Sequence, residues 1–282
     1  MRLATVRMEG TEHLAAAGAG GYRRLDRAGD LTALLRAGVD PRRLPLGEPV
    51  DGELAAPLRP GKIVAIGLNY LDHIRESNLE RPERPLVFAK FPSSVIGPTD
   101  AIELDEALTS RVDWEVELAV VVGRTMRRVA ERDALDHVFG YTVGNDVPAR
   151  DVQFSESQWV RGKSFDTFCP LGPIVVTADE IPDPQSLTLR TRVNGEVMQD
   201  SSTAEMVFGV AELLAFCSHS FTLEPGDVVL TGTPWGCGEF MDPPRSLAVG
   251  DVVEAEIEGI GALRNPVVIL PPLASDAGSG DR

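Results

Sequence analysis

The chain has 282 residues, of which 43 % are hydrophobic and 25 % are charged, and this composition excludes a disordered chain. It carries 27 basic and 43 acidic side chains, a net charge of −16 at pH 7. That charge argues against nucleic acid or an anionic membrane as a partner, because both bind basic patches. The cysteines, Cys169, Cys217 and Cys237, are too few and too scattered for a disulfide framework or a CxxC metal site.

The N-terminal end gives no sign of secretion. The first ten residues include Glu9 and lack the apolar run of a signal peptide. No apolar run along the chain approaches the roughly 20 residues that a membrane-spanning helix needs. We therefore expect a soluble protein located in the cytoplasm.

The first 60 residues are predicted to form a small N-terminal region or arm. A strand is expected at Leu3–Met8, and Asp30 is placed to cap a short helix that ends near Leu35. Several prolines between residues 41 and 60 then interrupt the pattern. The chain is thus expected to have three parts: the N-terminal region at 1–60, a main domain at 61–273 and a disordered tail at 274–282.

The pattern becomes clearer after residue 61. An apolar run predicts a strand at Lys62–Ile66, and Asn69 is placed to start a helix at Tyr70–Ser77. The polar, proline-containing residues 78–85 are expected to form an exposed loop that could act as a lid.

Strands dominate the rest of the chain. Asn194-Gly195 is a strong hairpin signal, and helical patterns stand at Glu131–His137 and Ala204–His219. No strand–helix repeat predicts a doubly wound sheet, so the fold class is α+β and β-rich. The further predicted strands are Leu86–Lys90, Trp114–Val122, Phe139–Asn145, Gly172–Thr177, Leu187–Val193, Asp227–Thr231, Val252–Ile257 and Pro266–Leu270.

Phosphate-binding loops and a zincin-type zinc site are excluded. The stretch Arg161-Gly162-Lys163-Ser164 resembles the end of a Walker A loop, but the required first glycine is replaced by Ser157. The pairs at Gly18 and Gly236 lack the third glycine of a dinucleotide-binding loop, and the histidines form no HxxxH pair.

Two glutamates interrupt an otherwise apolar strand. Alternate residues of a strand share a face, so Glu115 and Glu117 lie together, opposite the face that carries Trp114. Like charges this close repel unless they are neutralised. Either this face is in water, or the glutamates bind Mg²⁺, Mn²⁺ or Ca²⁺, since no histidine or cysteine is nearby to favour zinc. Asp113 is a weaker candidate ligand on the same face.

Two further groups could complete a site. Asp146 follows the predicted strand at Phe139–Asn145, where it can be a third ligand or simply part of an Asn-Asp turn. His73 and Glu76 are neighbours on a helix, so the carboxylate can orient the imidazole as a general base. Such a pair is also common as a weak surface contact.

Taken together, these motifs resemble the fumarylacetoacetate hydrolase family, in its acylpyruvase and 2-hydroxyhepta-2,4-diene-1,7-dioate isomerase branch. The resemblance covers roughly residues 62–270 and keeps the family's order and approximate spacing. The motifs are Gly67-Leu68-Asn69-Tyr70 with His73 and Glu76, Trp114-Glu115-Val116-Glu117, Gly144-Asn145-Asp146-Val147 with Arg150 and Gln153, Gly162-Lys163-Ser164-Phe165-Asp166, and Thr231-Gly232-Thr233-Pro234.

The resemblance implies a mixed β-sandwich roll, a homodimer, and one Mg²⁺ or Mn²⁺ per subunit, with Ca²⁺ as a substitute in crystals. It implies Glu115, Glu117 and Asp146 as metal ligands. It also implies three catalytic residues, His73, Glu76 and Lys163, and four substrate-binding residues, Lys90, Arg150, Gln153 and Thr233.

One loop departs from the family pattern. After Thr233 the family often has Pro-x-Gly-Val-Gly, whereas this chain has Pro234-Trp235-Gly236-Cys237-Gly238. The bulky Trp235 is expected to reshape the far end of the pocket and therefore to affect the choice of substrate.

The expected substrate is a small 2-oxo acid whose oxygens bind the metal. Our main hypothesis is hydrolysis of a carbon–carbon bond in a 2,4-dioxo acid, of acylpyruvate or 2,4-diketo-3-deoxy sugar acid type, with His73 and Glu76 activating water. The alternatives are decarboxylation of oxaloacetate and isomerisation of a 2-hydroxy-dienoate, because both pass through the same metal-stabilised enolate. A more remote alternative is a member that binds a metal or an organic acid without turnover.

Overall fold

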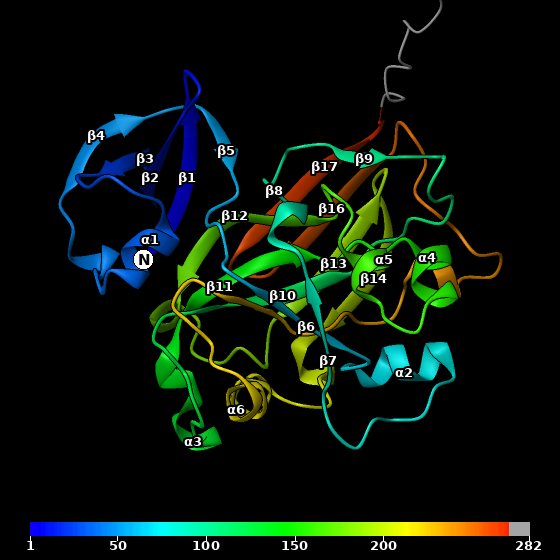
Figure 1. Ribbon diagram of the computed structural model, residues 1–282. Helices are drawn as coiled ribbons and strands as arrows, with labels where there is room; N and C mark the ends of the chain where they lie inside the picture. Colours follow the sequence, from blue (N-terminus) through cyan, green and yellow to red (C-terminus); the bar gives the residue numbers. More distant parts are fainter. Residues whose placement is uncertain (271–282) are drawn as a thin grey trace, which may run out of the picture.

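The computed structural model describes residues 1–270 and contains two β-sheets with few helices (Figure 1). Strands make up 39 % of the described residues and helices 21 %, which confirms the β-rich α+β fold. The tail predicted at residues 274–282 lies outside the described residues. Within residues 1–270, no helix combines the length and the apolar character needed to cross a bilayer.

The large sheet has twelve strands, ten of them in the order β4-β3-β2-β1-β12-β11-β10-β15-β6-β7, while β5 pairs with β1 and β8 pairs with β12. Its strands are β1 (Arg2–Met8), β2 (Thr11–Gly18), β3 (Gly21–Leu25), β4 (Leu46–Val50), β5 (Glu53–Ala55), β6 (Ile63–Gly67), β7 (Leu86–Lys90), β8 (Val95–Ile96), β10 (Val116–Val122), β11 (Val138–Asn145), β12 (Cys169–Thr177) and β15 (Val228–Leu230).

The second sheet has five strands in the order β14-β13-β16-β17-β9. They are β9 (Ile102–Leu104), β13 (Thr188–Val193), β14 (Glu196–Ser202), β16 (Val252–Ile257) and β17 (Gly261–Ile269). The Asn194-Gly195 turn joins β13 and β14, as expected. The α-helices are α1 (Leu31–Arg36), α2 (Leu71–Ser77), α3 (Glu131–Ala134), α4 (Arg150–Ser155), α5 (Val160–Lys163) and α6 (Val210–Ser220).

Strand β10 is buried on both faces, and its two faces belong to two different cores. Val116, Leu118, Val120 and Val122 pack in a core that also contains residues of α6 and of the second sheet. Ala119 and Val121 pack in a core that includes α1. The predicted alternation is therefore confirmed, and the face that carries Ala119 and Val121 continues toward Glu117.

The N-terminal residues form strands that the sequence analysis largely missed. Only β1 and the helix capped by Asp30 were expected, and the Asp30 carboxylate does accept a hydrogen bond of 2.8 Å from the Ala33 N–H. Strands β2 to β5 extend the large sheet through the pairing of β1 with β12 (Figure 1). Their short, glycine-bounded runs include charged residues such as Arg23 and Arg24, which hide the strand pattern.

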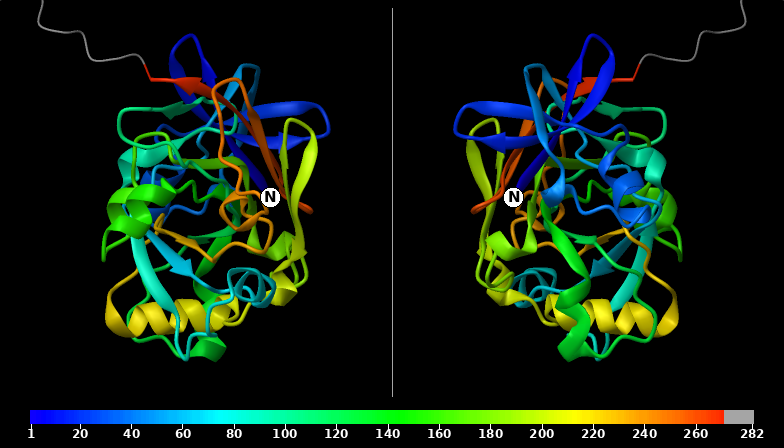
Figure 2. Two further views of the ribbon diagram at one scale, coloured as in Figure 1. Left: turned by 90° about the vertical axis from the view of Figure 1, so that its right-hand side faces the viewer. Right: turned by 90° about the vertical axis from the view of Figure 1, so that its left-hand side faces the viewer.

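The predicted helix at Ala204–His219 is shorter than expected. It begins at Val210, after a short 3₁₀ turn at Thr203–Glu205. The reason is a tertiary contact, because the Phe208 N–H donates to the Asn69 side chain at 2.9 Å and the Val207 N–H to the Asn69 carbonyl at 2.7 Å. Helix α6 lies across the end of the molecule opposite the β1–β2 turn (Figure 2).

Candidate active site and metal centre

Three carboxylates meet in the interior where β10 begins and β11 ends. Glu115 directly precedes β10, Glu117 lies within it, and Asp146 directly follows β11. The register pairs Val116 with Asn145, which brings the acidic residues of the two strands together. All three carboxylates are buried, and one oxygen of each lies within 4.8 Å of the others. The alternative in which this strand face is in water is excluded.

Lys163 neutralises part of this cluster. Its Nζ lies 2.6 Å from Glu115 Oε2 and 2.8 Å from Asp146 Oδ2. Burial disfavours the charged forms of Asp146 and Lys163. The positive charge of Lys163 outweighs this effect at Asp146, so the pKa of Asp146 is lowered. The negative charges of Asp146 and Glu115 likewise raise the pKa of Lys163. Burial, together with the charges of Asp146 and Glu115, raises the pKa of Glu117 well above its usual value.

The donor set fits a divalent cation that prefers oxygen. Asp146 Oδ1 is buried and has no hydrogen-bond partner of good geometry, although Lys90 Nζ lies 2.8 Å away. Glu117 accepts a hydrogen bond of 2.7 Å from the Gly232 N–H through its Oε2. Because three carboxylates repel one another in a buried site, a cation of charge +2 would relieve this repulsion.

A histidine–carboxylate pair faces the same pocket from helix α2. His73 Nδ1 lies 3.0 Å from Glu76 Oε2, and Glu76 Oε1 accepts a hydrogen bond of 2.8 Å from the Gly236 N–H. With Nδ1 donating to the carboxylate, Nε2 is the unprotonated nitrogen of a neutral imidazole. The His73 ring packs against Phe240 in a T-shaped arrangement, with ring centres 5.3 Å apart.

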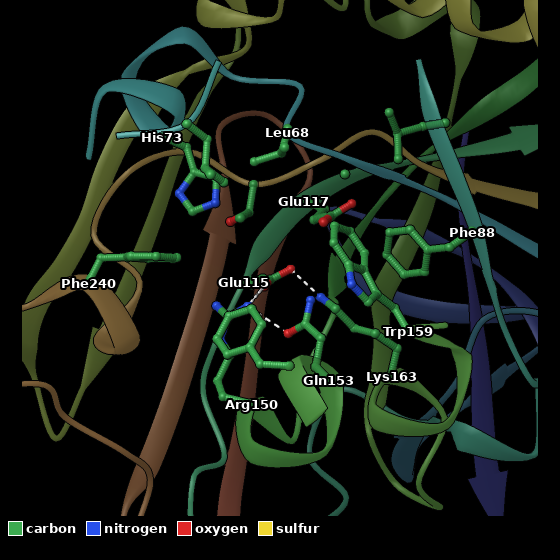
Figure 3. A pocket seen from close by; sticks show the side chains of 15 residues that line it. Leu68, His73, Phe88, Glu115, Glu117, Arg150, Gln153, Trp159, Lys163 and Phe240 are labelled. Carbon is green, nitrogen blue, oxygen red and sulfur yellow. Dashed lines mark hydrogen bonds and ion pairs between the residues drawn. The ribbon is translucent and has the colours of Figure 1, made fainter. Parts of the chain in front are cut away.

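One pocket joins the two groups, and Figure 3 shows His73 on one side of Glu115 and Glu117 and Lys163 on the other. Aromatic and aliphatic side chains form much of the remaining wall. The lining residues are Ile66, Gly67, Leu68, His73, Leu79, Phe88, Glu115, Glu117, Arg150, Gln153, Phe154, Trp159, Lys163, Thr233 and Phe240.

Gly162 explains how two predicted site residues come to face the same pocket. A Cβ atom at Gly162 would lie 2.7 Å from the backbone nitrogen of Gln153, so α5 can pack this closely against α4 only because residue 162 is glycine. This close packing places Lys163 and Gln153 beside each other along the pocket wall.

Asp113 binds Arg150, which corrects the expectation that Asp113 is a candidate metal ligand. Arg150 Nε and Nη2 lie 2.9 and 2.7 Å from Asp113 Oδ2, and Nη1 lies 2.7 Å from Glu115 Oε1. Burial disfavours the charged guanidinium of Arg150, but the negative charges of Glu115 and Asp113 outweigh this effect, so the pKa of Arg150 is raised. Asp113 also accepts hydrogen bonds from the N–H groups of Trp114 and Gly238, at 2.8 Å each. It therefore anchors the arginine and a loop and does not belong to the carboxylate cluster.

The other predicted substrate-binding residues differ in their surroundings. Thr233 lines the pocket, and its hydroxyl accepts a hydrogen bond of 2.9 Å from Gln199, which the sequence analysis missed. Lys90 is not part of the pocket wall. Its buried ammonium contacts Asp146 and the backbone carbonyls of Val147 and Lys163. Lys90 therefore offsets part of the negative charge of the carboxylate cluster.

A buried cluster of oxygen ligands opposite a histidine–carboxylate pair is typical of metal-assisted acid–base enzymes. The family described as fumarylacetoacetate (FAA) hydrolase C-terminal matches residues 62–268. The chain belongs to this family, as the sequence motifs indicated.

Several relatives have named activities. The chain is 52 % identical over 218 residues to the oxaloacetate tautomerase of Xenopus laevis, an alignment covering 76 % of this chain and 68 % of the relative. It is 49 % identical over 217 residues to a human oxaloacetate tautomerase, covering 76 % of this chain and 69 % of that protein.

Solved structures agree on the fold. The fumarylacetoacetate hydrolase of Exiguobacterium antarcticum superimposes with a TM-score of 0.87 at 40 % identity, covering 96 % of this chain and all of that one. A 5-carboxymethyl-2-hydroxymuconate delta-isomerase from Mycobacterium smegmatis gives 0.81 at 36 % identity over the same shares. The predicted mixed β-sandwich roll is thereby confirmed.

The expected cytoplasmic location is wrong, as the relatives similar in sequence show. The oxaloacetate tautomerases of Xenopus laevis, Bos taurus and Homo sapiens are mitochondrial proteins. The sequence argument considered only a secretory signal and a membrane span, and neither of these bears on a mitochondrial location.

Proposed function

We propose that this protein is a tautomerase that interconverts the keto and enol forms of oxaloacetate or of a closely related 2-oxo dicarboxylate. The observation that carries the proposal is one pocket lined by Glu115 and Glu117 of the buried three-carboxylate cluster and by His73 of the His73–Glu76 pair. The identity of about half of the aligned residues to oxaloacetate tautomerases supports the choice of reaction. For the hydrolase that we first expected, the support is the solved fumarylacetoacetate hydrolase of Exiguobacterium antarcticum, at a lower identity of 40 %.

The metal would be held by Glu115, Glu117 and Asp146, whose oxygens suit Mg²⁺ or Mn²⁺. When bound there, a divalent ion supplies Lewis acidity that favours negative charge on the 2-oxo oxygen of the substrate.

His73 is the proposed base. Glu76 holds the Nδ1 proton, so Nε2 is free to take a proton from the carbon next to the 2-oxo group. The C–H bond breaks, its electron pair forms the carbon–carbon double bond, and negative charge develops on the 2-oxo oxygen. The His73 imidazolium then returns its proton to that oxygen, which yields the enol and restores the neutral imidazole. Glu76 also stabilises the positive imidazolium that His73 becomes. Ketonisation runs through the same steps in reverse.

Lys163 and three pocket residues would position the substrate. The Lys163 ammonium remains charged because its pKa is raised, and its positive charge favours the negative charge that develops on the substrate oxygen. Gln153 Oε1 accepts from Arg150 at 3.1 Å, which leaves the amide N–H groups of Gln153 available to a substrate carboxylate. The Thr233 hydroxyl is a further polar group on the pocket wall.

Isomerisation of a 2-hydroxy-dienoate is the second candidate. A structurally similar protein from Mycobacterium marinum, 37 % identical with a TM-score of 0.74, is a 2-hydroxyhepta-2,4-diene-1,7-dioate isomerase. Such an isomerisation also moves a proton along a carbon chain next to a 2-oxo group, so the same base would serve it.

The test follows enol-oxaloacetate by its ultraviolet absorbance with Mg²⁺ or Mn²⁺, with and without a chelator. Chelator-sensitive acceleration of enol decay, without pyruvate release in a lactate dehydrogenase assay, supports the tautomerase. Matching pyruvate release would instead indicate decarboxylation. Parallel assays with acetylpyruvate and a 2-hydroxy-dienoate report hydrolysis and isomerisation, and turnover of one of these alone would overturn the proposal.

A further inference from the structure

A second group of metal-ligating atoms lies on the His73 side of the pocket. His73 Nδ1, a Glu76 carboxylate oxygen and Cys237 Sγ all lie within 4.8 Å of one another. Cys237 Sγ is 4.0 Å from His73 Nδ1, and Nδ1 is 3.0 Å from Glu76 Oε2. This group offers sulfur, nitrogen and oxygen donors, whereas the first cluster offers only oxygen.

The Cys237 thiol is buried but weakly bonded. Its Sγ lies 3.8 Å from Gln199 Nε2 and 3.9 Å from the Pro234 carbonyl oxygen, both long contacts for a hydrogen bond. Burial, together with the nearby charge of Asp113, raises the pKa of this thiol well above its usual value. The thiol takes no part in the proposed reaction.

The backbone around Cys237 is tightly fixed. Gly236 has a φ of +94°, and a Cβ atom there would lie 2.0 Å from the Met198 carbonyl oxygen. The Gly236 N–H donates to Glu76, so the loop that carries the thiol is tied to the helix that carries the imidazole. A cation ligated here would therefore meet donors that are already assembled.

The spacing suits a tetrahedral zinc ion. Zinc bonds of roughly 2.0–2.3 Å to nitrogen, oxygen and sulfur place neighbouring donors about 3.3–3.6 Å apart. The observed separations of 3.0 and 4.0 Å differ from these values by less than about 0.5 Å, a shift that side-chain torsions supply. A soft thiolate also favours zinc over magnesium.

We propose that His73, Glu76 and Cys237 form an inhibitory zinc site, separate from the three-carboxylate centre. The inhibitory effect rests on the proposed role of His73 as the base. Binding removes the thiol proton, which is released to solvent, while the imidazole stays neutral and its proton moves from Nδ1 to Nε2. A protonated Nε2 cannot accept the substrate's proton, so the bound metal blocks the reaction without occupying the magnesium ligands.

The binding test uses the purified protein with saturating Mg²⁺, so that the carboxylate centre is occupied. Zinc is titrated against a coloured chelator, and Co²⁺ serves as a spectroscopic substitute because a Co²⁺–thiolate bond absorbs in the near ultraviolet. We expect one tight zinc per chain and a thiolate band on adding Co²⁺.

The decisive variant is Cys237→Val, since valine often occupies this position in the family loop. It should lose the thiolate band and weaken zinc binding by at least about tenfold, the lower end of the effect of removing groups around a metal. Cys217→Ala is the matched control, because Cys217 is a buried thiol in α6 that belongs to the hydrophobic core. It should keep both signals, and thermal melting and Mn²⁺ binding show whether each variant is folded.

Activity provides the second measurement. Zinc should inhibit the unmodified protein and the Cys217→Ala variant, and it should inhibit Cys237→Val at least about tenfold less strongly. Equal zinc binding by Cys237→Val would overturn the site. Zinc binding that depends on Cys237 but leaves turnover unchanged would overturn the inhibition alone. Because binding is measured without substrate, failure of the proposed tautomerase activity would not affect the test of the site.

Discussion

The two halves of the pocket are built from different kinds of structure. Glu117 and Asp146 lie on or next to central strands of the large sheet and are almost fully buried. His73 lies on α2, a helix of seven residues followed by the mostly exposed segment 78–85. Helices this short are marginal on their own, so α2 depends on its contacts with the rest of the protein.

Those contacts are few and specific. Ser201 donates a hydrogen bond to the Asp72 carboxylate, and Gly236 donates one to Glu76. Like charges must be held together by rigid, buried backbone, whereas a base on a short helix can lie on an element that moves. The carboxylate half is therefore suited to holding a metal, and the histidine half to opening and closing around a substrate.

The largest expected effect comes from breaking the carboxylate half. Glu117→Gln keeps the shape of the side chain but removes one of three anionic ligands. We expect Mn²⁺ affinity to fall by more than about 100-fold, since even groups behind the ligands typically contribute 10–100-fold, and turnover to disappear. Calorimetric titration with Mn²⁺ measures the affinity, and an unchanged value would remove Glu117 from the ligand set.

Breaking the histidine half should separate chemistry from metal binding. His73→Ala removes the proposed base but no ligand of the carboxylate centre. Enol decay should slow by about 10²–10⁴-fold, the usual contribution of a general base, while Mn²⁺ affinity stays within about twofold. Stopped-flow absorbance with the same Mn²⁺ titration makes the comparison, and full activity would exclude His73 as the base.

A milder change should remove the negative charge beside His73 while keeping the hydrogen bond between α2 and the 236–238 loop. Glu76→Gln retains an acceptor for the Gly236 N–H but loses the charge that stabilises a protonated His73. We expect turnover to fall by about 10–100-fold, an effect smaller than loss of the base itself, with little change in metal affinity. Steady-state rates for the two variants should therefore rank His73→Ala below Glu76→Gln. The reverse order would contradict the assigned roles.

The smallest effect concerns the mobility of residues 78–85. This segment contains Glu80 and Glu83, both exposed and each followed by an arginine, as cleavage sites for a glutamyl endopeptidase. If α2 and this segment close over a ligand, Mg²⁺ with oxalate as a substrate analogue should slow cleavage there by a few-fold. Mass spectrometry of the fragments locates the cuts. Equal rates with and without the analogue would argue against closure.

The sequence predicted which site residues share an element, but not which distant residues surround them. The alternation along β10 is a local property, so the placement of Glu115 and Glu117 on one face could be anticipated from spacing, whereas their burial could not. The role of Asp113 could not, because it depends on Arg150 and on the 238–239 backbone, which are distant in sequence. The start of α6 was placed too early for the same reason, since contacts with Asn69 override the local helical pattern.

Cys237 shows a different limit of prediction from the sequence. In the sequence it is a single residue in a glycine-rich loop, far along the chain from His73 and Glu76. Only the fold brings the three side chains together, because the loop after β15 passes beside α2. A cysteine in place of the usual valine was visible in the sequence, but its neighbours were not.

The continuity of the large sheet has a consequence for the boundary of the catalytic unit. The family match begins at residue 62, yet β1 pairs with β12, and the Met1 amino group donates to Thr177 at 2.6 Å. A fragment starting at residue 62 would leave the edge of β12 without the β1 partner, with backbone groups free to pair with another chain. The N-terminal region and the strands that carry the carboxylates should consequently melt in one calorimetric transition, and the shortened fragment should aggregate.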